Sequence, residues 1–204
     1  MRRIPLSRRS HVTGFQPLPT GTAEHESALE RDFVTLAAFR DAAAAITSQP
    51  ITLRFRDGAA ARRYTPDFLV RWGDGRTDLV EVKYRADLHA NWSKLRPGFV
   101  VARAWARERG ASFRIATERG IRGVRLDNAK RLLPLRGAPI DVAAVECAMT
   151  AARSVPQPTF GRVVDALAGD RAAALGTVWR LIARGALAVD LTAPIGLDTP
   201  IRPS

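Results

Sequence analysis

The feature that most constrains the fold of this chain is a pair of strand-like segments joined by a short glycine-rich turn. Residues 64–72 and 78–84 are rich in aliphatic and aromatic side chains, and Gly73-Asp74-Gly75 lies between them. Glycines and an aspartate between two apolar runs are typical of the tight turn of a β-hairpin. The pattern therefore predicts two antiparallel strands, and symmetric pairing about Asp74 would fix their register.

This register brings charged residues together inside an otherwise apolar hairpin. Asp67 would lie directly opposite Glu81, with Cβ atoms about 4.5–5.5 Å apart, and Lys83 would share a strand face with Glu81. Two carboxylates at that separation repel each other unless a cation lies between them. Oxygen ligands suit Mg²⁺, with Mn²⁺ as its substitute. The hairpin therefore predicts a metal-binding acidic pair beside an amine.

The segments around the hairpin alternate between helical and strand-like patterns. Apolar residues at helical spacing and an alanine run predict a helix over residues 23–45. A helix over 89–109 is predicted with an interruption at Pro97-Gly98. The other predicted elements are strands over 51–55 and 113–117 and a helix over 124–133. This order predicts an α/β layered domain.

The pattern changes after a break marked by Pro134, Gly137 and Pro139. The elements predicted beyond it are helices over 140–152, 160–168 and 172–185, a strand over 187–191 and a turn over 194–196. Three helices followed by a small hairpin is the order of a winged helix-turn-helix. The predicted organisation is a basic N-terminal arm over 1–22, an α/β domain over 23–135 and a winged-helix-like α domain over 139–204.

The chain is strongly basic, and its basic residues are almost all arginine. Of 32 basic residues three are lysines and 29 are arginines, and the formal net charge is +12. Such a charge favours binding to a polyanion, with DNA or RNA ahead of an acidic membrane. The last predicted helix has no Asn or Gln with which to read bases, so we expect contacts to the DNA backbone. The candidate phosphate-binding residues are Arg8, Arg9, Arg171, Arg180 and Arg184.

Several other classes of protein are disfavoured. Cys147 is the single cysteine, which removes disulfides and cysteine-based zinc sites and fits a reducing, cytoplasmic environment. His11, His25 and His89 have no metal-ligand spacing. No run of 18 apolar residues exists and the first residues lack the apolar segment of a signal peptide, so we expect neither a membrane protein nor a secreted one.

The charged residues of the hairpin carry a resemblance to a known family. Pro66-Asp67 on one strand and Glu81-Val82-Lys83 on the next resemble the PD-(D/E)xK nuclease signature, and Glu30 in Ser27-Ala-Leu-Glu30 resembles the helical acid that precedes the sheet in such nucleases. Together with Tyr64-Thr-Pro-Asp-Phe-Leu-Val70 these motifs are similar to the TnsA-type transposon endonucleases. The resemblance implies a restriction-endonuclease-like core, with a mixed sheet flanked by helices, followed by a winged-helix-like domain.

The resemblance also implies a function. Glu30, Asp67 and Glu81 would bind Mg²⁺ and Lys83 would occupy the lysine position of a metal-dependent DNA endonuclease. Such an enzyme acts on double-stranded DNA at transposon ends, in a bacterial cytoplasm, and cuts the strand that its partner leaves intact. The implied partners are a DDE-type transposase and an AAA+ ATPase regulator.

Alternatives remain for the residues and for the function. Ser27-x-x-Glu30 also fits a capping box, in which Glu30 would only bond the helix start, and Glu81 with Lys83 could form a solvent-facing ion pair. Lys83 could orient or deprotonate a water molecule or stabilise the transition state. An autonomous restriction or repair nuclease is one alternative function, and a non-catalytic winged-helix adaptor that binds DNA is the other.

Overall fold

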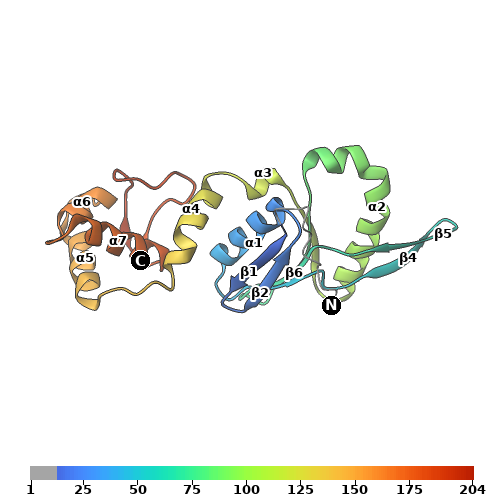
Figure 1. The fold of residues 1–204 in the computed structure, drawn as a ribbon, viewed down its shortest axis with the longest axis horizontal. Coiled ribbons are helices and arrows are strands. Elements are labelled where there is room, and N and C mark those ends of the chain that lie inside the picture. Colours follow the sequence, from blue (N-terminus) through green and yellow to red (C-terminus); the bar gives the residue numbers. More distant parts are fainter. Residues whose placement is uncertain (1–12) are drawn as a thin grey trace. The chain divides into compact units, whose positions relative to one another are not determined.

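The computed structural model describes residues 13–204, which form two compact units divided between Arg122 and Gly123. Figure 1 traces the chain through both units. The predicted domain boundary lies later, between residues 135 and 139. The division comes earlier because the helix over 124–132 packs with the C-terminal segment, where the Asn128 side chain donates hydrogen bonds to the carbonyl oxygens of Leu191 and Ala193.

The first unit is built on a four-stranded mixed sheet with strand order β3-β6-β7-β8. The first three strands pair antiparallel, whereas β7 and β8 pair parallel. The strands are β3 (Ala45–Ser48), β6 (Phe68–Arg71), β7 (Thr77–Val82) and β8 (Ser112–Ala116). A parallel pair needs a long crossover connection, and the helix α2 (Arg85–Glu108) supplies it. The expected α/β core with a mixed sheet and helices is therefore observed.

The hairpin of β6 and β7 has the register that the turn sequence predicts. Phe68 pairs with Val80 and Leu69 pairs with Leu79, which is symmetric pairing about Asp74. The Asp74 side chain accepts hydrogen bonds from the backbone and side chain of Arg76, so it stabilises the turn. Because the register is as expected, Asp67 and Glu81 lie at the same end of the hairpin.

Helices cover the two faces of this sheet. On one face α1 (Ala28–Arg40) packs on aliphatic and aromatic residues of alternate strand positions, which include Phe68, Val70, Val80 and Val82. On the other face Leu69 and Leu79 pack with Ala102 and Ala106 of α2. The alternation leaves Glu81 on the α2 face, where Leu79 also lies. A buried carboxylate thus interrupts an apolar strand.

Helix α1 is shorter at both ends than the segment 23–45. Ser27 caps its start, and Asp41 follows its last residue. The Asp41 carboxylate accepts hydrogen bonds from the backbone N–H groups of Ala43 and Gly73, which ends the helix and connects it to the β6–β7 turn. The alanines after Asp41 therefore lead into β3 instead of extending the helix.

Helix α2 runs through Pro97, where the sequence predicts an interruption. The non-helical residue is Asn91, with φ of −117°, and the helix is kinked there. Gly98 is buried, and a Cβ atom at this position would lie 2.9 Å from Cγ of Tyr64. The glycine therefore lets the helix approach the Tyr64 ring closely.

Two separate β-hairpins flank the sheet. Strands β1 (Gly14–Leu18) and β2 (Gly21–His25) pair across a turn at Gly21, whose φ is +139°. Residues 14–22 therefore do not form an irregular arm as predicted, and Arg8 and Arg9 lie outside the described residues. Strands β4 (Leu53–Asp57) and β5 (Ala60–Tyr64) form the second hairpin, which the sequence analysis found only in its first strand.

The second unit is mainly helical. The element bounds are α4 (Val124–Leu132), the 3₁₀ turn η1 (Leu133–Leu135), α5 (Val142–Ser154), α6 (Phe160–Asp165), α7 (Arg171–Ala183), β9 (Leu187–Ala188) and β10 (Arg202–Pro203), while α3 (Glu118–Ile121) ends the first unit. Phe160, Val163 and Val178 are among its fully buried residues. The strands β9 and β10 have two residues each, and the winged-helix assignment is not confirmed. No helix among residues 13–204 is both long enough and apolar enough to cross a bilayer.

We predict that Gly98→Ala destabilises the protein. Alanine favours a helix by about 1 kcal/mol over glycine, but the new Cβ would overlap the Tyr64 ring, and overpacking costs about 1–3 kcal/mol. Urea unfolding would measure the change. Gly120→Ala is the matched control, because no atom lies within 4 Å of a Cβ there. Equal loss in both variants would contradict the proposed close contact.

Candidate active site

Three of the predicted site residues lie at one end of the β6–β7 hairpin. Asp67 directly precedes β6. Glu81 is the second-last residue of β7, where it pairs with Ile115 of β8, and Lys83 directly follows β7. The backbone N–H of Lys83 donates to the carbonyl oxygen of Ala116 at 3.0 Å, so the lysine is held at the end of the parallel pair. The hairpin register therefore brings the two acids and the amine together, as the sequence predicts.

Glu81 is the most buried of these charged residues, with 3% of its surface exposed. Its Oε2 accepts a hydrogen bond from the Tyr64 hydroxyl at 2.6 Å, and its Oε1 lies 3.2 Å from Nζ of Lys83. Burial raises the pKa of Glu81, while Lys83 and the Tyr64 hydroxyl oppose that rise. This pairing is not the solvent-facing ion pair of the alternative interpretation, because the carboxylate is inside the protein.

Asp67 is half-buried beside Glu81. Its Oδ2 accepts a hydrogen bond from the backbone N–H of Val82 at 2.7 Å, which joins the start of β6 to the end of β7. Burial raises the pKa of Asp67 well above its usual range, and the charges of Glu81 and Glu30 raise it further. The single backbone hydrogen bond and Lys83 only partly offset this effect. The ionised acids therefore repel each other in the protein alone.

Lys83 and Tyr64 keep their protons in this environment. Burial lowers the pKa of Lys83, but the nearby carboxylates of Glu81, Asp67 and Glu30 outweigh burial and raise it. Burial also raises the pKa of Tyr64, and the charge of Glu81 adds to this rise. Lys83 is consequently an ammonium, and Tyr64 is a neutral hydrogen-bond donor.

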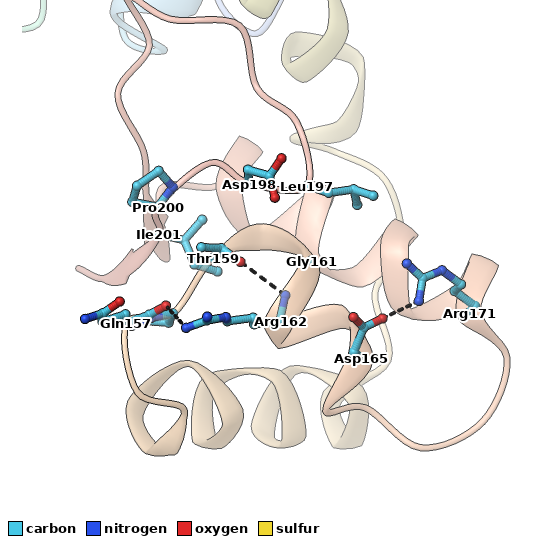
Figure 2. Close-up of a pocket in the computed structure, with 11 residues that line it drawn as sticks. Gln157, Thr159, Gly161, Arg162, Asp165, Arg171, Leu197, Asp198, Pro200 and Ile201 are labelled. Carbon is cyan, nitrogen blue, oxygen red and sulfur yellow. Dashed lines mark hydrogen bonds and ion pairs between the residues drawn. The ribbon is translucent and has the colours of Figure 1, made fainter.

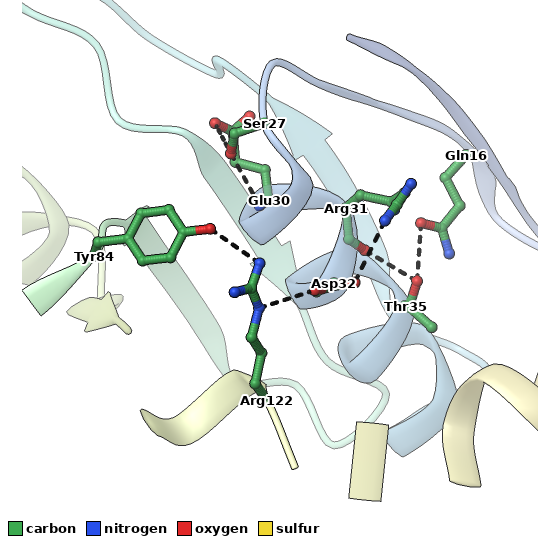
Figure 3. A network of polar contacts seen from close by, with 8 residues as sticks. All are labelled: Gln16, Ser27, Glu30, Arg31, Asp32, Thr35, Tyr84 and Arg122. Atoms are coloured by element: carbon green, nitrogen blue, oxygen red, sulfur yellow. Dashed lines mark hydrogen bonds and ion pairs between the residues drawn. The ribbon is translucent and has the colours of Figure 1, made fainter. Parts of the chain in front are cut away.

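Glu30 lies near the other acids but is engaged in the capping box. Its Oε1 accepts a hydrogen bond from the Ser27 hydroxyl at 2.8 Å (Figure 3). Its Oε2 accepts one from the backbone N–H of Glu26 at 2.7 Å. Its charge nevertheless acts on Asp67, Glu81 and Lys83. The structure thus shows the capping arrangement, with Glu30 within electrostatic range of the acidic pair.

Arg122 connects the helix of Glu30 to the residue after Lys83. Its Nε lies 3.3 Å from the Asp32 carboxylate on α1, and its Nη2 donates to the Tyr84 hydroxyl at 2.9 Å (Figure 3). The guanidinium also lies over the Tyr84 ring, 5.4 Å from its centre. These contacts link the start of α1 to the end of β7, and the charge of Glu30 on α1 acts on the hairpin acids.

The donor set fits a hard divalent cation. Among residues 13–204 no group of three or more His, Cys, Asp or Glu side chains is arranged to hold a metal. Mg²⁺, however, is commonly bound by one or two carboxylates and completes its shell with water and substrate phosphate. Asp67 and Glu81 provide two carboxylates whose mutual repulsion a cation would relieve. These two residues could therefore bind Mg²⁺ without a third protein ligand.

Two residues of this region were missed in the sequence. Tyr64 holds one oxygen of Glu81, although it lies in the motif used for the family resemblance. Gln49 follows β3 with φ of +44°, which is unusual for a residue other than glycine, and its backbone N–H donates to the Asp67 carbonyl at 2.7 Å. Its Oε1 is buried without a hydrogen-bond partner. Only their contacts with residues distant in the sequence reveal these two roles, because neither a tyrosine nor a glutamine by itself indicates an active site.

Two of the three arginines predicted to bind phosphates in the second unit have partners within it. Arg171 pairs with Asp165, and Arg184 donates to the carbonyl oxygen of Ala138 at 2.6 Å. Arg180 is half-buried, and its Nε has no hydrogen-bond partner. Their binding to DNA remains a prediction.

A pocket of about 570 Å³ lies in the second unit, between α6 and the loop that precedes β10 (Figure 2). Arg162 and Arg171 line it, but Arg162 donates to the carbonyl oxygens of Pro156 and Gln157, and Arg171 pairs with Asp165. The guanidinium groups of the pocket are therefore already bonded within the protein.

A mixed four-stranded sheet with helices on its faces is compatible with a nuclease-like α/β core, and an acidic pair and a lysine lie at the end of one of its hairpins. Residues 41–118 match the family model described as TnsA-like endonuclease N terminal. This segment is therefore similar to the TnsA-like endonuclease domain, which confirms the resemblance drawn from the motifs. The match includes Asp67, Glu81 and Lys83, and Glu30 precedes it. No curated protein matches the chain significantly.

We predict that Asp67→Asn stabilises the metal-free protein at neutral pH. A carboxyl whose pKa rises on folding opposes folding once it is ionised, and this penalty is absent below the unfolded pKa of about 3.9. Asparagine can still accept the hydrogen bond from Val82. The free energy of unfolding should therefore be higher than that of the wild type at neutral pH, and the gain should vanish below pH ~3.9.

Urea unfolding in a chelating buffer over a pH series would measure this difference. Asp74→Asn is the control, because hydrogen bonds from Arg76 lower the pKa of that exposed carboxyl, and its removal should give no gain. A wild type more stable than Asp67→Asn at neutral pH would contradict repulsion at the site.

Proposed function

We propose that this protein is a Mg²⁺-dependent DNA endonuclease that hydrolyses a phosphodiester at transposon ends. The observation that carries the proposal is half-buried Asp67 beside buried Glu81 and protonated Lys83, inside the segment that matches the TnsA-like endonuclease domain. Buried acids with raised pKa values and a specific charged neighbour are typical of functional sites. The excess of basic residues supports a polyanionic substrate.

Asp67 and Glu81 would hold Mg²⁺, and Mn²⁺ could replace it. Bound there, the ion would neutralise negative charge that builds on the phosphate oxygens during the reaction. Tyr64 would keep the Glu81 carboxylate in place through its hydroxyl. Glu30 would join the metal ligands only if its carboxylate left the capping box, because both its oxygens accept hydrogen bonds there.

Lys83 would act as a charge stabiliser and not as a base. Its pKa is raised, so at neutral pH it has a proton to donate but no lone pair with which to accept one. In the hydrolysis a water oxygen attacks the phosphorus, the bond to the 3′ oxygen breaks, and the proton that the water loses passes through solvent to the leaving 3′ oxygen. Negative charge builds on the phosphate oxygens and on the leaving oxygen in the transition state. An ammonium beside the acids would favour this transition state.

The proposed protein partners come from the resemblance to the TnsA-type endonucleases, because the amino-acid composition indicates neither of them. The TnsA-like domain suggests a nuclease subunit that works with a DDE-type transposase and an AAA+ ATPase regulator. In this proposal the protein cuts the DNA strand that the transposase leaves intact. The chain's charge would supply affinity for DNA without selecting a sequence, so selection of the transposon end falls to the partners.

We predict that Asp67→Asn abolishes Mg²⁺-dependent cleavage and leaves DNA binding intact. The substitution removes one of two metal-binding carboxylates but none of the basic side chains. Cleavage would be followed on labelled transposon-end DNA with the partners present, and binding would be measured without divalent ions. Asp74→Asn, in the exposed turn of the same hairpin, should cut like the wild type. Wild-type cleavage by Asp67→Asn would rule out this site.

We also predict that efficient cleavage requires the transposase. A basic nuclease without sequence selection would damage the host DNA if it were active alone. The same assay with and without the transposase tests this requirement. Efficient and site-specific cleavage by the purified protein alone would indicate an autonomous nuclease, and no cleavage under either condition would favour a non-catalytic DNA-binding adaptor.

A further inference from the structure

The β4–β5 hairpin is the most basic projecting element of the first unit. It lies outside the four-stranded sheet, and Figure 1 shows it extending beyond α2 as a two-stranded ribbon. Its strands contain four arginines, at positions 54, 56, 62 and 63, and a single acid, Asp57. Every residue of β5 before Tyr64 is exposed. The hairpin therefore presents positive charge on a largely uncovered ribbon.

The register separates these arginines into two groups. Residues directly opposite in an antiparallel pair lie on the same face, and Arg54 pairs with Arg63 while Arg56 pairs with Ala61. Arg54, Arg56 and Arg63 consequently form one face of the ribbon, which we name the arginine face. On the opposite face Arg62 forms an ion pair with Asp57 at 3.0 Å. The acid of the hairpin thus neutralises only the arginine that lies outside the arginine face.

The arginine face is electrostatically unfavourable in the protein alone. Like charges directly opposite each other destabilise a strand pair, and Arg54 and Arg63 are such a pair. Within residues 13–204 none of the three arginines forms a salt bridge, and the hydrogen bond from Arg56 to the Ala59 carbonyl oxygen carries no compensating charge. Isolated two-stranded hairpins are also only marginally stable. An anionic partner would relieve this repulsion.

The base of the hairpin is attached to the candidate active site. Leu53 is buried against α2, and its cross-strand neighbour Tyr64 donates a hydrogen bond to Glu81. Arg63 adjoins Tyr64, and Asp67 follows three residues later. A connection of a few residues therefore joins the arginine face to the acidic pair.

We propose that the arginine face of the β4–β5 hairpin binds the phosphate backbone of duplex DNA next to the bond that is cut. This inference rests on the proposed nuclease function, and it assigns the DNA contact to a part of the chain outside the arm and the last helix. A two-stranded ribbon fits the major groove of B-form DNA, which is about 12 Å wide. Arginine forks suit phosphate oxygens, to which they can donate two parallel hydrogen bonds.

The test compares two double variants of the full chain that lose the same charge. Arg54→Gln/Arg63→Gln alters the arginine face, and Arg103→Gln/Arg107→Gln removes two exposed arginines of α2. Binding to a fluorescein-labelled duplex of arbitrary sequence would be measured by anisotropy, in a chelating buffer, between ~50 and ~200 mM salt. Thermal unfolding of each variant would check its fold.

We expect the hairpin variant to bind duplex DNA more weakly for any sequence, with a salt dependence reduced by about one in slope for each arginine lost. The α2 variant should keep the wild-type slope. The thermal midpoint of the hairpin variant should not fall, because the substitution removes a repulsion between exposed side chains. A wild-type slope in the hairpin variant, or the same loss in both variants, would overturn the proposal. Since this assay contains no divalent metal, a failure of cleavage would contradict the nuclease function without altering the binding result.

Discussion

The structure of the site depends on one strand pairing, the register of β6 with β7. This register lets the Asp67 carboxylate accept a hydrogen bond from the Val82 backbone and brings it beside buried Glu81. Two further contacts of the site depend on the position of Glu81, since Tyr64 and Lys83 each contact one of its carboxylate oxygens. The apolar packing on both faces of the hairpin must offset the repulsion between the acids, because the raised pKa of Asp67 shows that its neighbours do not compensate it.

The parts predictable from the sequence are those governed by local rules. A turn sequence between two apolar runs set the register, and strand alternation placed Glu81 and Lys83 on one face. The errors arose where distant contacts decide. Helix α2 continues through Pro97 because it packs on the sheet, and residues 14–18 form a strand because β2 pairs with them. The second strand of the β4–β5 hairpin was missed although Asp57-Gly58 is itself a turn sequence, since its exposed arginines and alanines lack an apolar alternation.

The same distinction applies to individual site residues. Ser27-x-x-Glu30 matched two patterns at once, and the hydrogen bonds of Glu30 are those of the capping box. Its charge still reaches Asp67 and Glu81, and Arg122 links the start of α1 to Tyr84. A local pattern could give the backbone role of Glu30 but not this tertiary position. Gln49 likewise has no sequence signature, although its left-handed backbone conformation supports the Asp67 carbonyl.

If the proposed function is correct, DNA binding and phosphodiester hydrolysis take place in parts of the first unit that carry opposite charge. The arginine face attracts phosphate, whereas Asp67, Glu81 and Glu30 outnumber Lys83 and repel it. A phosphodiester held by the arginines could therefore approach the acids only after a divalent cation had neutralised them. The acids would gain a cation, the arginine face would gain phosphates, and each would lose a repulsion that exists in the protein alone. The unfavourable charges of the free protein would in this way make productive binding depend on DNA and metal together.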